Sequence, residues 1–225
     1  MFNPDAVAPS VSPAAPTVPP GKPDSTVLAI EPDQRIYQPP SWFERLDLQK
    51  MFGRSAPLEV ELGSGDGSFL IEWARRHPER DFIGVERLLG RIRKLDRKSQ
   101  RTGLTNVLGL RIEASYCVEF LLPPATASAI HIYFPDPWPK RRHHKNRLVN
   151  EHFATLIRQA LQPGAAVHLR TDNLDYFSQM ESVFNACPGL HRIPTPEPLA
   201  ALMTDFEREF VAAGIPTQRA SYARD

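Results

Sequence analysis

The sequence predicts an α/β fold: a doubly wound, mainly parallel β-sheet with helices on both faces. From position 58 onward, short apolar runs typical of buried strands alternate with longer amphipathic stretches typical of helices. This alternation favours parallel strands joined by helical crossovers. Each motif that carries chemistry follows one of the predicted strands, and ligands of such sheets bind beyond the carboxyl ends of the strands.

The elements follow one another in a regular order. A strand over 58–62 (LEVEL) precedes a glycine-rich turn and a helix over 67–76; a second strand over 82–86 precedes a basic helix over 89–101. A third strand over 107–112 leads to a short helix over 116–121, and a fourth strand over 129–134 (AIHIYF) leads to a proline-rich loop. A helix over 148–161, a fifth strand over 165–171 and a helix over 174–186 complete the pattern.

The first 25 residues form a segment of different character. They carry a proline every few positions, and proline lacks the backbone donor that a helix or sheet requires. We therefore expect a disordered proline-rich tail over 1–25 and a single domain over 26–225, because 225 residues suffice for one sizeable core.

Composition narrows the class of protein. A hydrophobic fraction of 41% and a charged fraction of 24% are ordinary for a soluble domain. The sequence contains no run of about 18 apolar residues, so we expect no membrane span. Cys117 and Cys187 stand far apart without a CxxC motif, which indicates neither a disulfide framework nor a zinc site. The histidines show no ligand spacing, so we expect no metal. A cytoplasmic location is the default.

Positive charge is clustered although the net charge is only +1. Seven Lys and Arg lie within 87–101 and five more within 140–147. A polyanion responds to local potential rather than to net charge, so both clusters are candidate nucleic-acid contacts. The first cluster equally fits the solvated face of a helix.

The turn after the first strand reads Gly63-Ser64-Gly65-Asp66-Gly67. Glycines allow a sharp turn and a close approach of the backbone to a ligand. The spacing is G-x-G-x-G, whereas a dinucleotide fingerprint needs a third glycine at position 68, where Ser68 stands. The turn alone therefore does not identify the ligand.

Acidic residues around this turn narrow the choice of ligand. Glu61 precedes the glycines, Glu86 ends the second strand and Glu113 follows the third. Glu86 is placed to accept hydrogen bonds from ribose hydroxyls, and Glu113 from an adenine amino group. Carboxylates repel a pyrophosphate but suit an amino group and a sulfonium, so S-adenosylmethionine fits better than a dinucleotide. Each acid taken singly also fits a surface position at a strand end.

The loop after the fourth strand reads FPDPWPK over 134–140. Alternating prolines stiffen it, so that Asp136 is held in place, as an active site requires. Trp138 is either a stacking surface for a base or a plug in the core.

On these motifs the chain resembles the bacterial tRNA (guanine-N7-)-methyltransferase family over roughly 42–224. The marks of the resemblance are FPDPWPK at 134–140 with RRHHKNR at 141–147, HLRTDN at 168–173 and TDFE at 204–207. The resemblance implies a class I methyltransferase fold with a seven-stranded sheet whose last strand is antiparallel. It further implies methyl transfer from S-adenosylmethionine to N7 of a guanine in the variable loop of tRNA, by a monomer or homodimer.

The resemblance assigns roles to individual residues, with Asp136 as the catalytic position. The implied cofactor contacts are Glu61, Gly63, Gly65, Gly67, Glu86, Glu113 and Asp136. The implied substrate contacts are Lys140, Asp172, Thr204, Asp205, Phe206 and Glu207. The implied RNA contacts are Arg142, His143, His144, Lys145, Asn146 and Arg147. Two positions depart from the family pattern: Glu113 replaces Asp or Asn, and Asn146 replaces a basic residue.

Guanine N7 carries a free lone pair, so the attack needs positioning rather than a general base. We expect Asp136 to orient the base and to stabilise the positive charge that develops on it. Asp172 and Glu207 are candidates to accept hydrogen bonds from guanine N–H groups. Asp172 equally fits a helix N-cap, and Thr204 with Glu207 fits a capping box. His143 and His144 are expected to be exposed in the RNA-facing loop.

Three alternatives stay open. The Asp-Pro-Trp sequence is similar to the loop of amino-group methyltransferases acting on adenine N6, although Trp138 stands where that loop has a second proline. A nicotinamide dehydrogenase is a more distant alternative. A non-catalytic RNA-binding module on a methyltransferase fold is the third, and Glu113 and Asn146 favour it slightly.

Overall fold

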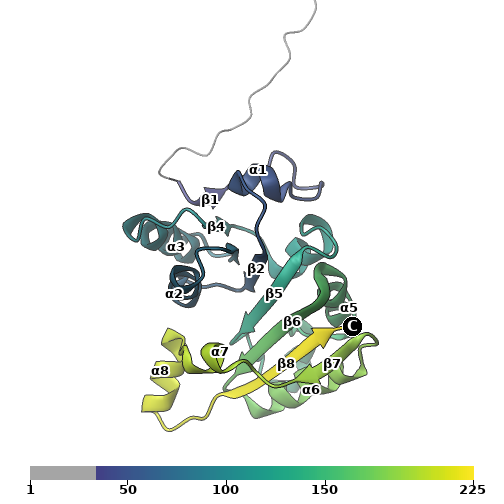
Figure 1. Ribbon diagram of the computed structural model, residues 1–225. Coiled ribbons are helices and arrows are strands. Elements are labelled where there is room, and N and C mark those ends of the chain that lie inside the picture. Colours follow the sequence, from purple (N-terminus) through teal and green to yellow (C-terminus); the bar gives the residue numbers. More distant parts are fainter. Residues whose placement is uncertain (1–33) are drawn as a thin grey trace, which may run out of the picture.

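The computed structural model describes residues 34–225, which form one mixed sheet flanked by helices (Figure 1). The tail predicted over 1–25 lies outside the described residues. The order of the eight strands is β1-β4-β3-β2-β5-β6-β8-β7. Their bounds are β1 Ile36–Tyr37, β2 Leu58–Leu62, β3 Asp81–Val85, β4 Val107–Leu110, β5 Ala127–Tyr133, β6 Leu161–Thr171, β7 Leu190–Ile193 and β8 Gln218–Arg224.

The predicted sheet is confirmed, with one strand more than expected. All pairings among β1 to β6 are parallel, and β8 is antiparallel to both β6 and β7. The described residues form eight strands rather than seven because the two-residue β1 adds to the edge beside β4. The last strand of the chain is the antiparallel one, as predicted.

The five helices predicted from the sequence are present over most of their length, and three further α-helices within the described residues, at 48–52, 197–201 and 205–212, lie outside the predicted ranges. The helices are α1 Leu48–Phe52, α2 Ser68–Arg76, α3 Leu89–Arg101, α4 Ala114–Tyr116, α5 Glu151–Ala160, α6 Leu174–Ala186, α7 Glu197–Ala201 and α8 Asp205–Ala212, with a π-helix at Cys117–Leu121 and a 3₁₀ helix at Arg141–Asn146. The helix expected from position 148 begins at Glu151, because the Asn150 side chain accepts from Phe153 N and caps it. No helix in residues 34–225 is both long and apolar enough to span a membrane.

Two apolar clusters lie on the two faces of the sheet. On one face, α2 and α3 contribute Phe69, Leu70, Trp73 and Leu95. On the other face, the larger cluster contains Phe153 of α5 and buried side chains of α6. This arrangement confirms that helices cover both faces.

Strand β2 lies at the point where the chain changes direction across the sheet. It pairs with β3 on one side and with β5 on the other, and such a switch point opens a crevice at the carboxyl ends of the strands. Its residues alternate between the faces, as strand residues do. Val60 and Leu62 join the larger cluster, whereas Glu59 faces α2, where it accepts a hydrogen bond from Trp73.

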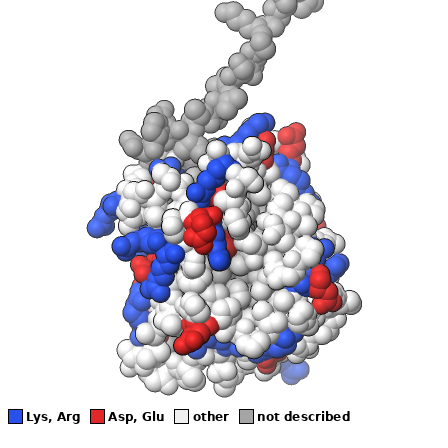
Figure 2. Space-filling view, viewed as in Figure 1, with Lys and Arg blue, Asp and Glu red and all other residues white. Residues whose placement is uncertain are grey.

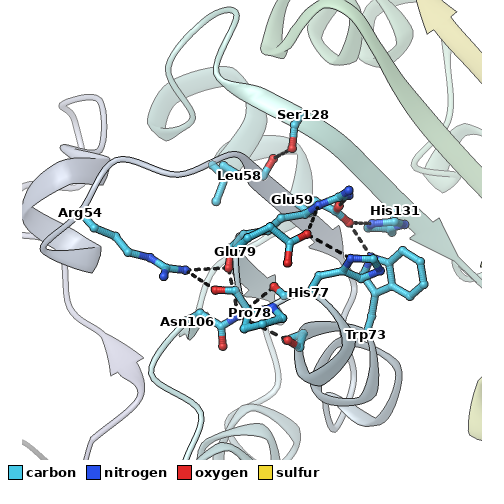
Figure 3. A network of polar contacts seen from close by, with 12 residues as sticks. Arg54, Leu58, Glu59, Trp73, His77, Pro78, Glu79, Asn106, Ser128 and His131 are labelled. Atoms are coloured by element: carbon cyan, nitrogen blue, oxygen red, sulfur yellow. Dashed lines mark hydrogen bonds and ion pairs between the residues drawn. The ribbon is translucent and has the colours of Figure 1, made fainter.

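Glu59 is the centre of a buried polar network on that face (Figure 3). Its Oε2 lies 2.8 Å from both Trp73 Nε1 and His131 Nε2, and its Oε1 pairs with Arg80. These donors outweigh the cost of burial and lower the pKa of Glu59 to about 2. The other ring nitrogen of His131, Nδ1, lies within hydrogen-bond distance of the Tyr133 hydroxyl, at 2.9 Å, and so extends the network to Tyr133.

Candidate active site

The glycine turn joins β2 to α2, and all three of its glycines adopt the left-handed conformation. Gly63, Gly65 and Gly67 have φ values of 83°, 57° and 77°, a region that other residues enter only with strain. A Cβ at Gly67 would lie 2.7 Å from the Leu95 side chain, whereas one at Gly63 or Gly65 would meet open space. Gly67 therefore serves packing, and the first two glycines leave backbone exposed to a ligand.

Glu61 lies at the end of β2 in the wall of a small cavity above this turn. The residue is only 4% exposed, yet its Oε2 has no hydrogen-bond partner among the described residues. Burial raises the pKa of Glu61 well above its ordinary range; Arg170 opposes this shift, and Asp66 and Glu86 add to it. A buried polar group without a partner is costly, so this oxygen is prepared for a donor that the protein itself does not supply.

Glu86 holds the glycine turn from behind. Its carboxylate accepts from Gly65 N at 3.2 Å and from Leu88 N at 2.8 Å, and the residue is 6% exposed. The structure thus gives Glu86 an internal bracing role at the place where a ribose contact was predicted.

Glu113 lies at the same edge of the sheet but outside the cavity. It is exposed, and its carboxylate caps α4 by accepting from Tyr116 N at 3.0 Å and from the Ser115 hydroxyl. The predicted contact to adenine therefore has a structural competitor, because one carboxylate oxygen already caps the helix.

The start of α8 covers the cavity. Thr204, Asp205 and Phe206 line it opposite the glycines, and Asp205 Oδ2 lies 2.5 Å from Ser68 Oγ. Figure 1 shows α7 and α8 beside α2. The enclosed space is about 50 Å³, whereas pockets for small ligands span roughly 300–1,000 Å³. In this conformation the enclosed space is therefore smaller than a nucleotide-sized ligand requires.

Arg170 of β6 anchors this cover to the sheet. The side chain is 1% exposed, donates to Leu202 O at 2.8 Å, and forms an ion pair with Glu207 at 2.6 Å. It also stacks over Tyr133, with its guanidinium carbon 4.3 Å from the ring centroid. The sequence analysis gave Arg170 no role; the available signal was an arginine near the end of a predicted buried strand, one residue before Thr171.

Two predicted substrate contacts have internal partners instead. Glu207 is fully buried, and besides Arg170 its carboxylate receives Arg219 at 2.5 Å. Thr204 Oγ1 accepts from Glu207 N at 3.0 Å, which completes the capping box. Both oxygens of Glu207 are thus engaged within the protein, so its predicted contact to guanine has internal competitors. Asp205 and Phe206 remain exposed.

Asp172 follows β6 and is half-buried. The alternative of an N-cap does not apply to it, because Asn173 caps α6 by accepting from Tyr176 N at 2.9 Å. The Asp172 carboxylate has no hydrogen bond within residues 34–225, so it is free to accept from a ligand.

The loop over 134–140 is held by its backbone and its neighbours. Phe134 and Trp138 have positive φ values of 51° and 43°, a conformation that costs energy for residues with a side chain. Phe134 lines the cavity, while Trp138 is half-buried and lies edge-on to His143 with ring centroids 5.8 Å apart. Strained backbone of this kind gathers at functional sites.

Asp136 is exposed and does not line the cavity. Its carboxylate has no hydrogen bond among the residues that the structure describes. The predicted catalytic residue therefore lies outside the enclosed cavity, two residues after Phe134, which forms part of the cavity wall.

The basic segment over 141–147 divides into exposed and buried parts. Arg142, Lys145 and Asn146 are exposed, and so is the neighbouring Lys140. Arg147 is buried instead: its side chain is 2% exposed and donates to Pro137 O at 2.8 Å, to Gln179 Oε1 at 2.7 Å and to Asp175 at 2.5 Å. These internal partners compete with the predicted contact of Arg147 to RNA.

The two histidines of this segment are half-buried rather than exposed. His143 packs against Trp138, and His144 Nε2 lies 3.8 Å from Asp175. Within the described part of the chain, no group of three or more His, Cys, Asp or Glu side chains is arranged to hold a metal ion.

Comparison with known proteins gives concordant matches. A family model described as "Putative methyltransferase" matches residues 55–220. Proteins named tRNA (guanine-N(7)-)-methyltransferase are similar over most of this chain: 39% identity over 181 residues in Thiobacillus denitrificans (79% of this chain, 78% of the relative) and 36% over 176 residues in Halorhodospira halophila (75% of both). The relative from Chromohalobacter salexigens is 39% identical over 153 residues, which span 68% of this chain and 62% of that protein.

Solved structures with a similar fold share little sequence. The 16S rRNA methyltransferase KamB aligns with a TM-score of 0.59 at 16% identity, covering 81% of this chain and 95% of that one. TrmN from Thermus thermophilus aligns with a TM-score of 0.55 at 16% identity, covering 79% of this chain and 47% of that one. These likenesses support the fold.

Proposed function

The chain belongs to the tRNA (guanine-N7-)-methyltransferase family, and on that premise we propose that it transfers the methyl group of S-adenosylmethionine to N7 of a guanine in tRNA. The observation that carries the proposal is the unpartnered, buried Glu61 oxygen beside the exposed backbone of Gly63 and Gly65. A carboxylate in that position fits an ammonium group, and the open glycine turn fits the body of a nucleoside.

The residues around the cavity fit this cofactor in kind. Glu61 accepts from the amino group, Gly63 and Gly65 give the backbone room, and Gly67 keeps α2 close to α3. Glu86 keeps the turn in its shape through Gly65 N. We assign the ribose hydroxyls to Glu86, and the adenine amino group to the carboxylate oxygen of Glu113 that does not cap α4. S-adenosylmethionine supplies an electrophilic methyl group on a sulfonium sulfur.

The residues after β5 and β6 serve the acceptor base. Guanine N7 needs no base to remove a proton, so the carboxylates of Asp136 and Asp172 orient the purine by accepting from its N–H groups. They also favour the positive charge that moves onto the purine. Both are free of internal partners in the described residues, which supports these roles.

The exposed side chains of the 3₁₀ helix bind the RNA. Arg142, Lys145 and Asn146 face solvent beside Lys140, while buried Arg147 keeps the segment in place. Phosphate contacts of this kind set register and affinity rather than sequence specificity. Because the proposed substrate is tRNA, we place the activity in the cytoplasm. The chain acts as a monomer or a homodimer.

The direct test is methyl transfer from labelled S-adenosylmethionine to unmodified tRNA, followed by strand cleavage at alkylated purines. We expect label in tRNA and cleavage at a single guanine. Label on an exocyclic amine would replace the proposal by amino-group methylation, and tRNA binding without transfer would replace it by a non-catalytic RNA-binding role.

Asp136→Ala tests the assignment of the catalytic position. We expect kcat to fall by about 10²–10³, the scale of losing one group that stabilises developing charge, with S-adenosylmethionine affinity nearly unchanged. Asp225→Ala, which removes an exposed carboxylate at the C-terminus, is the matched control and should leave kcat intact. Near-normal turnover in Asp136→Ala would remove Asp136 from the mechanism.

A further inference from the structure

A groove much larger than the cofactor cavity runs between α2, α3 and the start of α8. It encloses about 610 Å³. Helix α2 lines it with Ser68, Ile71, Glu72 and Arg76, whose spacing places them on one helical face. We call it the α2–α8 groove; among the residues given a cofactor or substrate role above, Asp205 alone lines it.

The rim of the groove is cationic. Arg76, Lys98, Arg101 and Arg208 line it, against Glu72 and Asp205. Lys98 pairs with Asp66 at 2.8 Å, Arg76 pairs with Glu72 at 2.9 Å, and Arg208 pairs with Asp205. Exposed ion pairs of this kind contribute little stability, so an incoming anion can compete for their cations. Arg101 is exposed and makes no ion pair within residues 34–225.

A row of positive charge on α3 leads into the groove. Arg91 and Lys94 precede Lys98 by seven and four positions and Arg101 follows it by three, so the four side chains share one flank of the helix. At about 1.5 Å of rise per residue the row is about 15 Å long. Figure 2 shows Lys and Arg side chains gathered on the flank where Figure 1 places α3.

The floor of the groove is apolar, and its upper end adjoins the cofactor cavity. Ile71 and Leu202 are buried beneath it, and Met203 is 41% exposed in its wall. Ser68 and Asp205 line both the groove and the cavity. A nucleic-acid strand whose target base lies at the active site matches this combination, because its phosphates suit the cationic rim and its apolar faces suit the floor.

We propose that the α2–α8 groove, together with the α3 row, binds the sugar-phosphate backbone of the RNA substrate as a second contact, separate from the segment 141–146. This proposal rests on the proposed function. It assigns the positive face of α3 to RNA, although that face also suits a solvated helix whose basic last turn complements the helix dipole.

The test compares two charge reversals on the same helix in the full-length protein. Arg101→Glu places an acid in the groove, whereas Arg93→Glu places one on the opposite flank, beside Asp96 and Gln100 by helical spacing. With unmodified tRNA we expect Arg101→Glu to raise KM about tenfold or more and Arg93→Glu to change it less than twofold. S-adenosylmethionine affinity, measured by calorimetry, should stay the same in both.

The salt dependence of tRNA binding is a second measurement, and a mere loss of protein stability does not change it. For Arg101→Ala we expect the slope of log Kd against log salt concentration to fall by roughly 0.7–0.9, the value for one lost phosphate contact. Equal KM values and slopes in the Arg101 and Arg93 variants would overturn the proposal, and so would a loss confined to melting temperature.

The outcome also separates this proposal from the one on which it rests. If the wild-type chain transfers no methyl group to tRNA, the proposed function fails. If the wild-type chain is active and the Arg101 variants bind tRNA like the wild type, only the α2–α8 groove loses its role. Tenfold weaker tRNA binding in Arg101→Glu supports the groove.

Discussion

Two glutamates two positions apart on β2 illustrate the difference between the structural and the functional parts of this sheet face. Glu59 and Glu61 are both almost fully buried. Glu59 meets donors from Trp73, Arg80 and His131, and its pKa is lowered to about 2. Glu61 keeps an oxygen without a partner, and its pKa is raised well above its ordinary range.

The difference shows where the protein has completed its own hydrogen bonds and where it has left one for a ligand. A satisfied buried carboxylate stabilises the fold, whereas an unsatisfied one costs stability and is retained where a ligand supplies the missing donor. The two regions are in contact because His131 joins Glu59 to Tyr133, which lines the cavity. The network around Glu59 therefore supports the cavity wall.

The largest expected effect is on the Glu59 side. Glu59→Ala leaves His131 and Arg80 without their partner and should lower the free energy of unfolding at pH 7 by about 3–5 kcal/mol. The folded-state pKa of about 2 lies below the ordinary 4.5, so the stabilisation is complete above pH 4.5 and is lost as the pH falls toward 2. Denaturant titrations at pH 7 and pH 3 measure both.

The wild-type chain and the Glu59→Ala variant should therefore converge in stability at low pH. Parallel curves between pH 7 and pH 3 would contradict the assignment of Glu59 as a structural ion-pair partner. At pH 7, the folded fraction of the variant should still bind S-adenosylmethionine.

Glu61→Gln should have the opposite signature. Losing a charge-assisted hydrogen bond should weaken S-adenosylmethionine binding by about 1.5–3 kcal/mol. The raised pKa means that wild-type stability falls as the pH rises above 4.5 through the folded-state pKa. The amide removes that slope and should increase the free energy of unfolding at neutral pH by about 0.5–2 kcal/mol.

Calorimetry with S-adenosylmethionine and denaturant titration of the same preparation check both halves of the Glu61 prediction. A variant that binds the cofactor normally, or one that is less stable than wild type at pH 7, would make Glu61 a structural residue like Glu59.

The smallest expected effects distinguish two basic residues two positions apart. Arg147→Ala should cost about 1–3 kcal/mol of stability through its lost hydrogen bonds. Lys145→Ala should change stability by less than about 0.5 kcal/mol and should flatten the salt slope of tRNA binding by somewhat under one. A flattened slope with unchanged stability in Arg147→Ala would mean that the arginine leaves its internal site to contact RNA.

The local sequence determined the framework of this protein. The strand and helix pattern, the positive-φ glycine turn and the capping box at Thr204 follow from short-range rules of backbone geometry and periodicity. The motifs after each strand indicated the edge of the sheet where the site lies, because parallel strands bring their carboxyl ends together.

Tertiary structure alone decided which of several residues of like charge face a ligand and which have partners within the protein. Glu61 stands closer than Glu59 to the glycine turn, but strand periodicity places both on one face of β2 and does not show which of them is satisfied internally. Lys145 and Arg147 are likewise two basic residues of one short segment. Their roles depend on donors and acceptors supplied from remote strands and helices, such as His131 for Glu59 and Gln179 for Arg147. Likewise, Arg170 and Glu207 join α8 to β6 across 37 positions of chain, and only folding brings that buried pair together.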